Sequence, residues 1–175
     1  MRSLGFDTSV LSPFARADLL PVLEQVTAGE RRIVTRAVLV EIQHGIATGY
    51  PELERVLRAG WLEQVRVDSP RELESFAELA LRFGRTGRDV GEATTIAWAL
   101  ANGGTVVTDD RVAYNVCREH RIPVLRSMRL LAGALHKGIL ASERVAAVVD
   151  ALLDRGARLP VGSGDAFLSW YRGHL

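Results

Sequence analysis

Short segments rich in β-branched residues alternate along this chain with longer amphipathic segments, and that alternation is typical of an α/β protein with a parallel sheet. Each short segment predicts a strand, and each long one predicts a crossover helix. The predicted strands are residues 3–6, 32–34, a stretch within 57–67, 105–108 and 122–125. The predicted helices are 11–26, one starting near 35, one opened by Pro70, 89–102, 111–120 and 145–153, with Gly156 as a stop.

Five strands with crossovers on both faces predict one doubly wound α/β domain. The chain has 175 residues, about the length of one domain and enough to bury one sizeable core. Hydrophobic residues make up 47% and charged residues 25%, which excludes an intrinsically disordered chain.

Charge and cysteine content suggest a soluble protein of a reducing compartment, so we expect a cytoplasmic location. The net charge is +1, which favours no class of partner by itself. Cys117 is the single cysteine, so no internal disulfide can form. The longest uncharged stretch, residues 93–108, contains Asn102, Gly103, Gly104 and threonines, and is too short and polar to cross a membrane.

Acidic residues follow the ends of two predicted strands. Asp7 comes after the first strand, and Asp109 and Asp110 come after the strand at 105–108. In open parallel sheets the functional crevice lies beyond the carboxyl ends of the strands. If these two strands are neighbours, the three carboxylates converge in that crevice.

Further acids lie on two predicted helices. Glu41 interrupts an otherwise apolar helical run, so we expect its carboxylate to be at least half-buried and to need a partner. Asp89 and Glu92 are three residues apart, on one face at the start of a helix. Taken singly, helix capping explains most of these acids: Asp89 and Glu92 fit a capping box, and Asp7 and Asp110 fit N-caps.

Taken together, the acids favour a divalent-metal site. Carboxylates gathered in one crevice repel one another, and a cation with oxygen ligands relieves that repulsion. Mg²⁺ or Mn²⁺ bound there would activate water for phosphodiester hydrolysis. Zinc is disfavoured, because four scattered histidines and one cysteine show no ligand spacing.

Four short motifs in order resemble those of the PIN-domain nucleases, and in particular the VapC-like toxins of prokaryotic toxin–antitoxin pairs. The resemblance covers roughly residues 4–130. A C-terminal extension is similar to that of a subgroup with a Gly-Glu form of the third motif, whereas the main toxin branch usually has Asp there. The motifs are Phe6-Asp7-Thr8-Ser9-Val10-Leu11, Val40-Glu41-Ile42, Asp89-Val90-Gly91-Glu92-Ala93 and Val106-Val107-Thr108-Asp109-Asp110-Arg111.

This resemblance implies a five-stranded parallel sheet flanked by helices and Mg²⁺- or Mn²⁺-dependent cleavage of RNA. It also implies a homodimer and a small antitoxin that covers the groove. Residues 1–175 would form one PIN-like domain, with a core of about 1–130 and a helical extension of about 131–175. The residues carried over are the acids Asp7, Glu41, Glu92 and Asp110, with Asp109 as an alternative fourth acid, Asp89 as a helix cap and Ser9 as a hydroxyl near the metal.

Two other functions remain open at the level of sequence. A catalytically silent PIN-fold module that binds RNA or protein would share the fold, and only metal binding and turnover separate it from an enzyme. A phosphoryl-transfer aspartate in a dehalogenase-like phosphatase would need a second Asp two residues after Asp7, where this chain has Ser9. Between Arg82 and Arg129 there are eight basic and five acidic residues, which suits a polyanionic substrate but equally suits solvated helix faces.

Overall fold

A five-stranded, all-parallel sheet forms the centre of the computed structural model, which describes residues 2–83 and 90–174. The strand order is β3-β2-β1-β4-β5, so β1 lies between β2 and β4 and the order reverses there. This confirms the predicted α/β sheet. The first and fourth strands are neighbours, which is the condition on which convergence of the strand-end acids depended. The strands are β1 (Ser3–Phe6), β2 (Arg31–Thr35), β3 (Glu63–Val65), β4 (Thr105–Val107) and β5 (Val124–Leu125).

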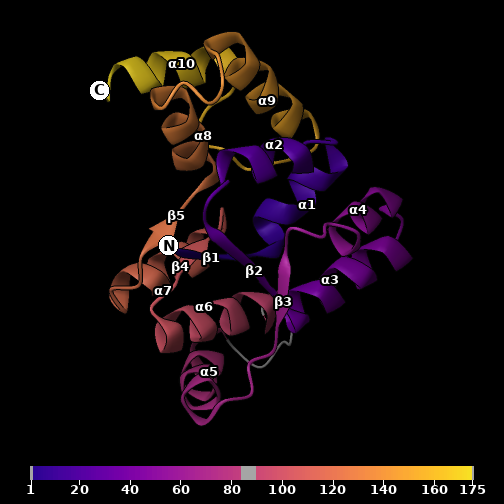
Figure 1. Cartoon of the computed structure of the whole chain (residues 1–175), viewed down its shortest axis with the longest axis vertical. Helices are drawn as coiled ribbons and strands as arrows, with labels where there is room; N and C mark the ends of the chain where they lie inside the picture. The colour runs from indigo at the N-terminus through magenta and orange to yellow at the C-terminus, as the bar shows by residue number, and fades with distance from the viewer. Residues whose placement is uncertain (1, 84–89, 175) are drawn as a thin grey trace.

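Helices cover both faces of the sheet. Figure 1 shows α1, α2 and the C-terminal helices above the sheet, and α5 and α6 below it. Successive side chains of a strand point to opposite faces of the sheet, so both faces need a helical layer. In β4, Val106 packs in the core cluster that contains α6, and Val107 packs in the cluster that contains α1 and α2. The helical elements are α1 (Thr8–Arg16), α2 (Leu20–Val26), α3 (Arg36–Ala47), η1 (Pro51–Leu53), α4 (Glu54–Leu57), α5 (Pro70–Phe83), α6 (Val90–Asn102), α7 (Arg111–Glu119), α8 (Ser127–His136), α9 (Ser142–Asp154) and α10 (Gly164–Arg172).

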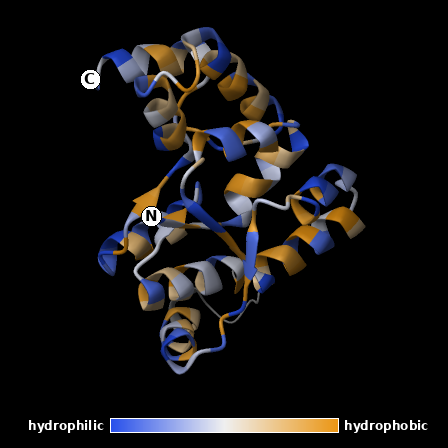
Figure 2. Cartoon of the chain, viewed as in Figure 1, coloured by the Kyte–Doolittle hydropathy of each residue, from blue (hydrophilic) through white to orange (hydrophobic). Residues whose placement is uncertain are grey.

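The outer helices are amphipathic, and Figure 2 shows both hydrophobic and hydrophilic segments on the ribbons of α3 and α9. The C-terminal helices bury their apolar faces in the same core cluster as β1, α1 and α2, through residues such as Leu131, Val149 and Phe167. Among the described residues, no helix has the length and apolar character needed to cross a bilayer.

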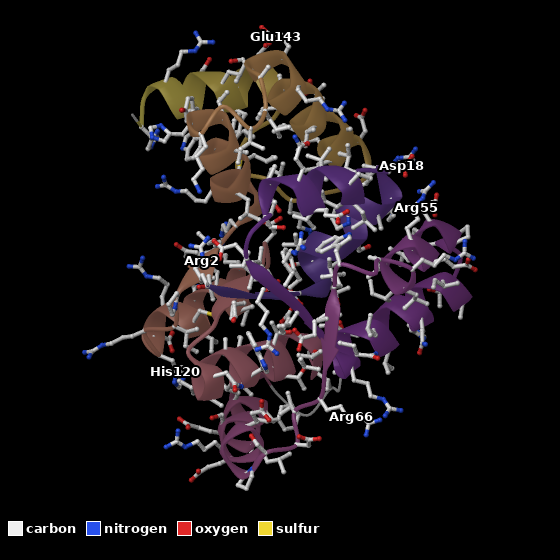
Figure 3. All side chains as sticks on the ribbon, viewed as in Figure 1. Arg2, Asp18, Arg55, Arg66, His120 and Glu143 are labelled. Atoms are coloured by element: carbon white, nitrogen blue, oxygen red, sulfur yellow. The ribbon has the colours of Figure 1, made fainter. Side chains whose placement is uncertain are left out.

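One helix predicted over residues 11–26 is wrong, because the structure has two helices there. Between α1 and α2, Asp18 adopts the left-handed conformation with φ of +59°, which aspartate tolerates better than most residues. Arg55 of α4, although far away in sequence, stabilises the end of α1 at this break. Its guanidinium donates to the Ala15 carbonyl at 3.0 Å. The same side chain pairs with Asp18, with 3.3 Å between Nε and Oδ1 (Figure 3).

Gly5 lies in the middle of β1, where a glycine ordinarily weakens a strand. A Cβ at this position would lie 3.2 Å from Thr95 and 3.3 Å from Trp98 of α6. The missing side chain therefore allows α6 to pack directly on β1. The close approach of α6 matters because α6 begins with the third acidic motif.

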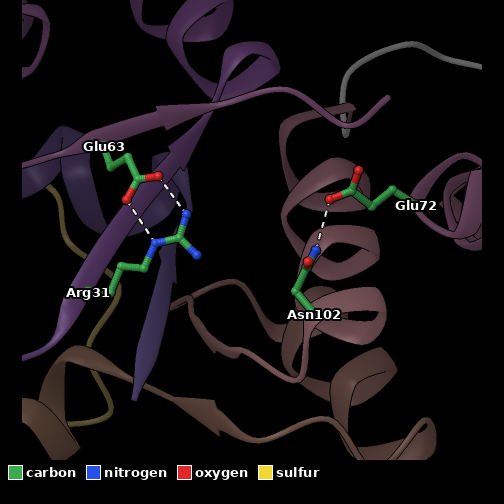
Figure 4. Close-up of polar contacts among 4 residues, drawn as sticks. All are labelled: Arg31, Glu63, Glu72 and Asn102. Carbon is green, nitrogen blue, oxygen red and sulfur yellow. Dashed lines mark hydrogen bonds and ion pairs between the residues drawn. The ribbon is translucent and has the colours of Figure 1, made fainter. Parts of the chain in front are cut away.

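Figure 4 shows two polar contacts at the margins of the fold. Arg31 of β2 donates to both carboxylate oxygens of Glu63 on the edge strand β3, at 2.8 and 2.5 Å. Glu72 of α5 accepts from the amide of Asn102 at the end of α6, at 2.8 Å. Its other oxygen accepts from the Ser69 hydroxyl and from two backbone N–H groups before α5.

Glu72→Ala is predicted to destabilise the fold by about 1–3 kcal/mol at pH 7, because it removes hydrogen bonds to a buried carboxylate. These hydrogen bonds outweigh desolvation and hold the pKa of Glu72 below its ordinary value of 4.5. A depressed pKa stabilises the fold above the unfolded-state value, and the contribution is lost as pH falls through the folded value. Urea unfolding at pH 7 and in acid should therefore show the wild-type advantage shrinking in acid.

The matched control is Glu74→Ala, on the exposed side of the same helix. It should change the free energy of unfolding by less than about 0.5 kcal/mol. Equal losses in the two variants would contradict a specific role for Glu72.

Candidate functional site

Asp7 lies at the carboxyl end of β1, and its carboxylate is enclosed by hydrogen-bond donors. Oδ1 accepts from the Thr8 N–H at 2.8 Å. Oδ2 accepts from the Ser9 hydroxyl at 2.6 Å, from the Thr108 hydroxyl at 2.9 Å and from the Ser9 N–H at 3.4 Å. The backbone N–H of Asp7 also continues the sheet by donating to the Val107 carbonyl at 3.1 Å. The adjacency of β1 and β4 thus places Asp7 against Thr108.

Burial dominates the electrostatics of this carboxylate. Asp7 is 1% exposed, and none of the ion pairs among the described residues includes it. Desolvation raises the pKa of Asp7, and the hydrogen bonds from Ser9, Thr108 and Thr8 offset only part of that rise. Burial, with the charge of Asp7 as a second cause, raises the pKa of the Cys117 thiol to about 12. A thiol of that pKa is protonated at neutral pH, so Cys117 supplies no thiolate nucleophile.

Glu41 is half-buried on α3, as its apolar surroundings predicted, and it connects two of the acidic motifs. Its Oε1 accepts from the Gly91 N–H at 2.7 Å, at the start of α6. Its Oε2 accepts from the Thr8 hydroxyl. Because the Thr8 N–H also donates to Asp7, one threonine holds both carboxylates.

Asp109 and Asp110 have different partners, which bears on the choice between them. Both oxygens of Asp109 are used, because Oδ1 accepts from the Ser127 N–H at 2.9 Å and Oδ2 from the Ser127 hydroxyl at 2.6 Å. Desolvation raises the pKa of Asp109 despite these bonds. Asp110 caps α7 through Oδ1 alone, which accepts from the N–H groups of Val112 and Ala113. Among the described residues, no hydrogen bond uses its Oδ2.

Thr108 connects Asp110 to Asp7. The Thr108 hydroxyl donates to Asp7 and accepts from the Asp110 N–H at 3.1 Å. Glu92 follows Gly91 in the first turn of α6 and is half-buried. A continuous series of contacts therefore joins all four motifs, running from Gly91 through Glu41, Thr8, Asp7 and Thr108 to Asp110. Asp89, predicted as the cap of α6, lies outside the described residues.

Several acids of this site also satisfy backbone N–H groups at helix starts. Asp7 is the N-cap of α1 and Asp110 is the N-cap of α7, as the capping interpretation predicted. Glu41 accepts from a backbone N–H in the first turn of α6. The partial positive charge at a helix N-terminus stabilises a nearby anion. Helix ends thus supply part of the electrostatic compensation for these buried and half-buried acids.

The donor chemistry fits Mg²⁺ or Mn²⁺, because the candidate ligands are carboxylate oxygens. Asp7 is a buried carboxylate with no cationic partner among the described residues, which is the kind of group that a cation would stabilise. Within residues 2–83 and 90–174, no three His, Cys, Asp or Glu side chains lie close enough to hold one ion. The hydroxyl and amide contacts described above hold the acids near one another without assembling a complete ligand set.

Three residues of this network were missed as site residues by reasoning from sequence: Thr8, Thr108 and Gly91. Thr108 is 0% exposed and is the hydroxyl shared between two strand ends. A Cβ at Gly91 would lie 2.5 Å from the Glu41 carboxylate, so a larger residue here would displace that carboxylate. The only signal in the sequence is that each lies directly beside a motif acid.

Gly91→Ala is predicted to displace the Glu41 carboxylate and, because Thr8 joins Glu41 to Asp7, to weaken divalent-metal binding by roughly threefold or more. The α6 helix itself should not weaken, because alanine is the better helix former. Mn²⁺ titration calorimetry and circular dichroism measure the two effects.

Gly133→Ala is the matched control, since a Cβ at this glycine of α8 would meet no atom within 4 Å. Its metal affinity should equal that of the wild type. Unchanged metal affinity in Gly91→Ala would mean that Glu41 has no role in binding the ion.

Comparison with known proteins supplies the family. A family model described as PIN domain matches residues 5–169, which is almost the whole chain. No curated protein and no solved structure matches the chain significantly. The matched segment contains all four acidic motifs and all of the sheet except the first two residues of β1. PIN domains are generally nucleases that typically use divalent metals, and this chain belongs to the PIN-domain family.

Proposed function

We propose that the protein is a divalent-metal-dependent endoribonuclease. The observation that carries this proposal is the environment of Asp7. Its carboxylate is buried at the point where strand order reverses, has only N–H and O–H donors around it among the described residues, and is joined through single threonines to Glu41 and Asp110. A buried cap also needs hydrogen-bond donors, but the connection of Asp7 to two further acids goes beyond what one cap requires and favours a site that receives a cation.

In this proposal Asp7, Glu92 and Asp110 are the metal ligands, and Glu41 is the further catalytic acid. Asp110 is preferred to Asp109 because its Oδ2 is available, whereas both oxygens of Asp109 bind Ser127. A bound Mg²⁺ or Mn²⁺ would activate water and stabilise charge on the phosphate.

The hydroxyl groups of the site orient the carboxylates. The Ser9 hydroxyl donates to Asp7 and accepts from the Asp109 N–H at 3.0 Å, so it fixes the Asp7 carboxylate relative to the loop after β4. Thr8 holds the Asp7 and Glu41 carboxylates close to each other. This preorganisation reduces the reorganisation needed when the reaction begins.

We further propose that this nuclease is the toxin of a toxin–antitoxin pair, on the basis of its resemblance to VapC-like toxins. This role brings with it a homodimer, a cytoplasmic location and a small antitoxin that covers the groove. Growth arrest on expression in a bacterial host, absent with Asp7→Asn, would support this role.

A catalytically silent PIN-fold module is the second candidate. One observation favours it: among the described residues the acids do not form a ready-made metal-binding group. Titration calorimetry with Mn²⁺ and Mg²⁺ distinguishes the two candidates, because only the enzyme needs a bound divalent metal ion.

Asp7→Asn is predicted to reduce Mn²⁺ and Mg²⁺ affinity by roughly tenfold or more in titration calorimetry, and to abolish RNA cleavage. The fold should survive, because the substitution is nearly isosteric and removes a buried negative charge. The melting temperature should therefore change by no more than about 4 °C. An unfolded variant would instead show that Asp7 acts mainly as the cap of α1 and supports the fold.

The control Asp165→Asn removes an exposed carboxylate from the first turn of α10 and should leave both properties unchanged. Glu92→Gln tests the third acid: full metal affinity in this variant would leave Glu92 with only a role in its helix. A wild-type protein that binds neither metal would favour the silent module.

A further inference from the structure

A cavity of about 570 Å³ lies beside the acidic site, and arginines dominate its charge. Helix α1 forms one wall with Thr8, Ser9 and Ser12, next to the loop that carries Asp109 and Asp110. The opposite wall comes from the loop between α9 and α10. The five arginines that line the cavity are Arg16, Arg111, Arg126, Arg155 and Arg158, and we refer to it as the arginine pocket.

The two acids in this pocket offset only part of the charge of its five arginines, and the charge of Arg126 acts on Asp109. Asp109 is bound to Ser127, and Asp110 caps α7. Among the described residues, the ion pairs within 4.0 Å include none of the five arginines. Five arginines beside two carboxylates leave an excess of positive charge in the cavity, and an anionic ligand would balance that excess.

Two of these arginines are held in place by aromatic rings. The Arg16 guanidinium lies 4.5 Å from the centre of the Tyr50 ring, and that of Arg126 lies 4.3 Å from the centre of the Tyr114 ring. Stacking of this kind orients a guanidinium without using its N–H donors. The Nε of Arg126 is buried and has no hydrogen-bond partner. A buried, unsatisfied donor is costly, and a phosphate oxygen would satisfy it.

The C-terminal part of the chain supplies the remaining wall. At the end of α9, Gly156 adopts φ of +82°, and the N–H of Ala157 donates to the Leu152 carbonyl at 3.0 Å. This helix-terminating turn directs the chain back across α1. It sets Arg155 and Arg158 in the pocket, although they are far in sequence from every acidic motif.

We propose that the arginine pocket binds phosphates of single-stranded RNA next to the scissile bond, and that Arg155 and Arg158 extend the substrate site into the C-terminal segment. This inference rests on the proposed nuclease function. Arginine recognises phosphate through paired N–H donors, and the volume lies within the range of pockets that enclose a ligand of nucleotide size. Because Asp110 lines the same cavity, a phosphate bound there would place the adjoining backbone beside the acids.

The test is fluorescence anisotropy with a short, labelled, mixed-sequence single-stranded RNA in EDTA, at salt concentrations from about 50 to 200 mM. Arg155→Ala/Arg158→Ala should weaken binding by roughly tenfold or more. It should also reduce the slope of log affinity against log salt by about 1.4, since each phosphate contact to a single strand contributes about 0.7. Arg155→Lys/Arg158→Lys keeps the charges, so it should keep the slope while losing part of the affinity.

Arg118→Ala/Arg144→Ala is the matched control, because it removes the same charge from exposed positions outside the pocket. Its RNA affinity should lie within about twofold of the wild type. An Arg155→Ala/Arg158→Ala variant with wild-type affinity and slope overturns the inference, as does a wild-type protein that does not bind the RNA.

Metal calorimetry on the same variants separates this inference from the proposed function. Arg155→Ala/Arg158→Ala should bind Mn²⁺ like the wild type. If the wild type binds no metal but its RNA affinity depends on Arg155 and Arg158, the arginine pocket stands and the nuclease proposal fails. If metal binding is intact and RNA affinity ignores both arginines, the nuclease proposal stands and the pocket inference fails.

Discussion

The parallel pairing of β1 with β4 is the constraint on which the site depends. It brings the end of one strand, with Asp7, against the end of the other, with Thr108, whose hydroxyl donates to Asp7 at 2.9 Å. A carboxylate that is 1% exposed needs such donors, because burial without hydrogen bonds costs several kcal/mol. The same hydroxyl accepts from the Asp110 N–H, so the pairing of two strands also sets the start of α7.

Helix capping and the candidate chemistry use the same carboxylates. Asp7 and Asp110 each satisfy backbone N–H groups at a helix start, and Glu41 does so for Gly91. Helix N-termini compensate negative charge within their first turn. The chain can therefore keep these acids near one another, with no salt bridge to Asp7 among the described residues. The same acid can cap a helix and bind a metal ion. Asp110, for example, uses only one carboxylate oxygen for its cap.

The C-terminal helices connect the core of the fold to the arginine pocket. Their apolar faces belong to the same buried cluster as β1, α1 and α2. Gly164 allows α10 to lie against the backbone of α9, because a Cβ there would lie 2.3 Å from the Ala146 carbonyl oxygen. This packing fixes the loop that carries Arg155 and Arg158 beside α1. The segment 149–158 thus contains both core residues, such as Val149 and Leu152, and the pocket residues Arg155 and Arg158.

The sequence alone determined the α/β class, the segments that contain the five strands and the positions of the acidic motifs, because hydrophobic periodicity and strand-end acids are local patterns. Tertiary structure decided the rest. The break at Asp18 depends partly on Arg55 from another helix. The roles of Thr8, Thr108 and Gly91 depend on distances between strands and helices that no local pattern encodes. The arginine pocket likewise exists only because packing brings residues 155–158 to α1.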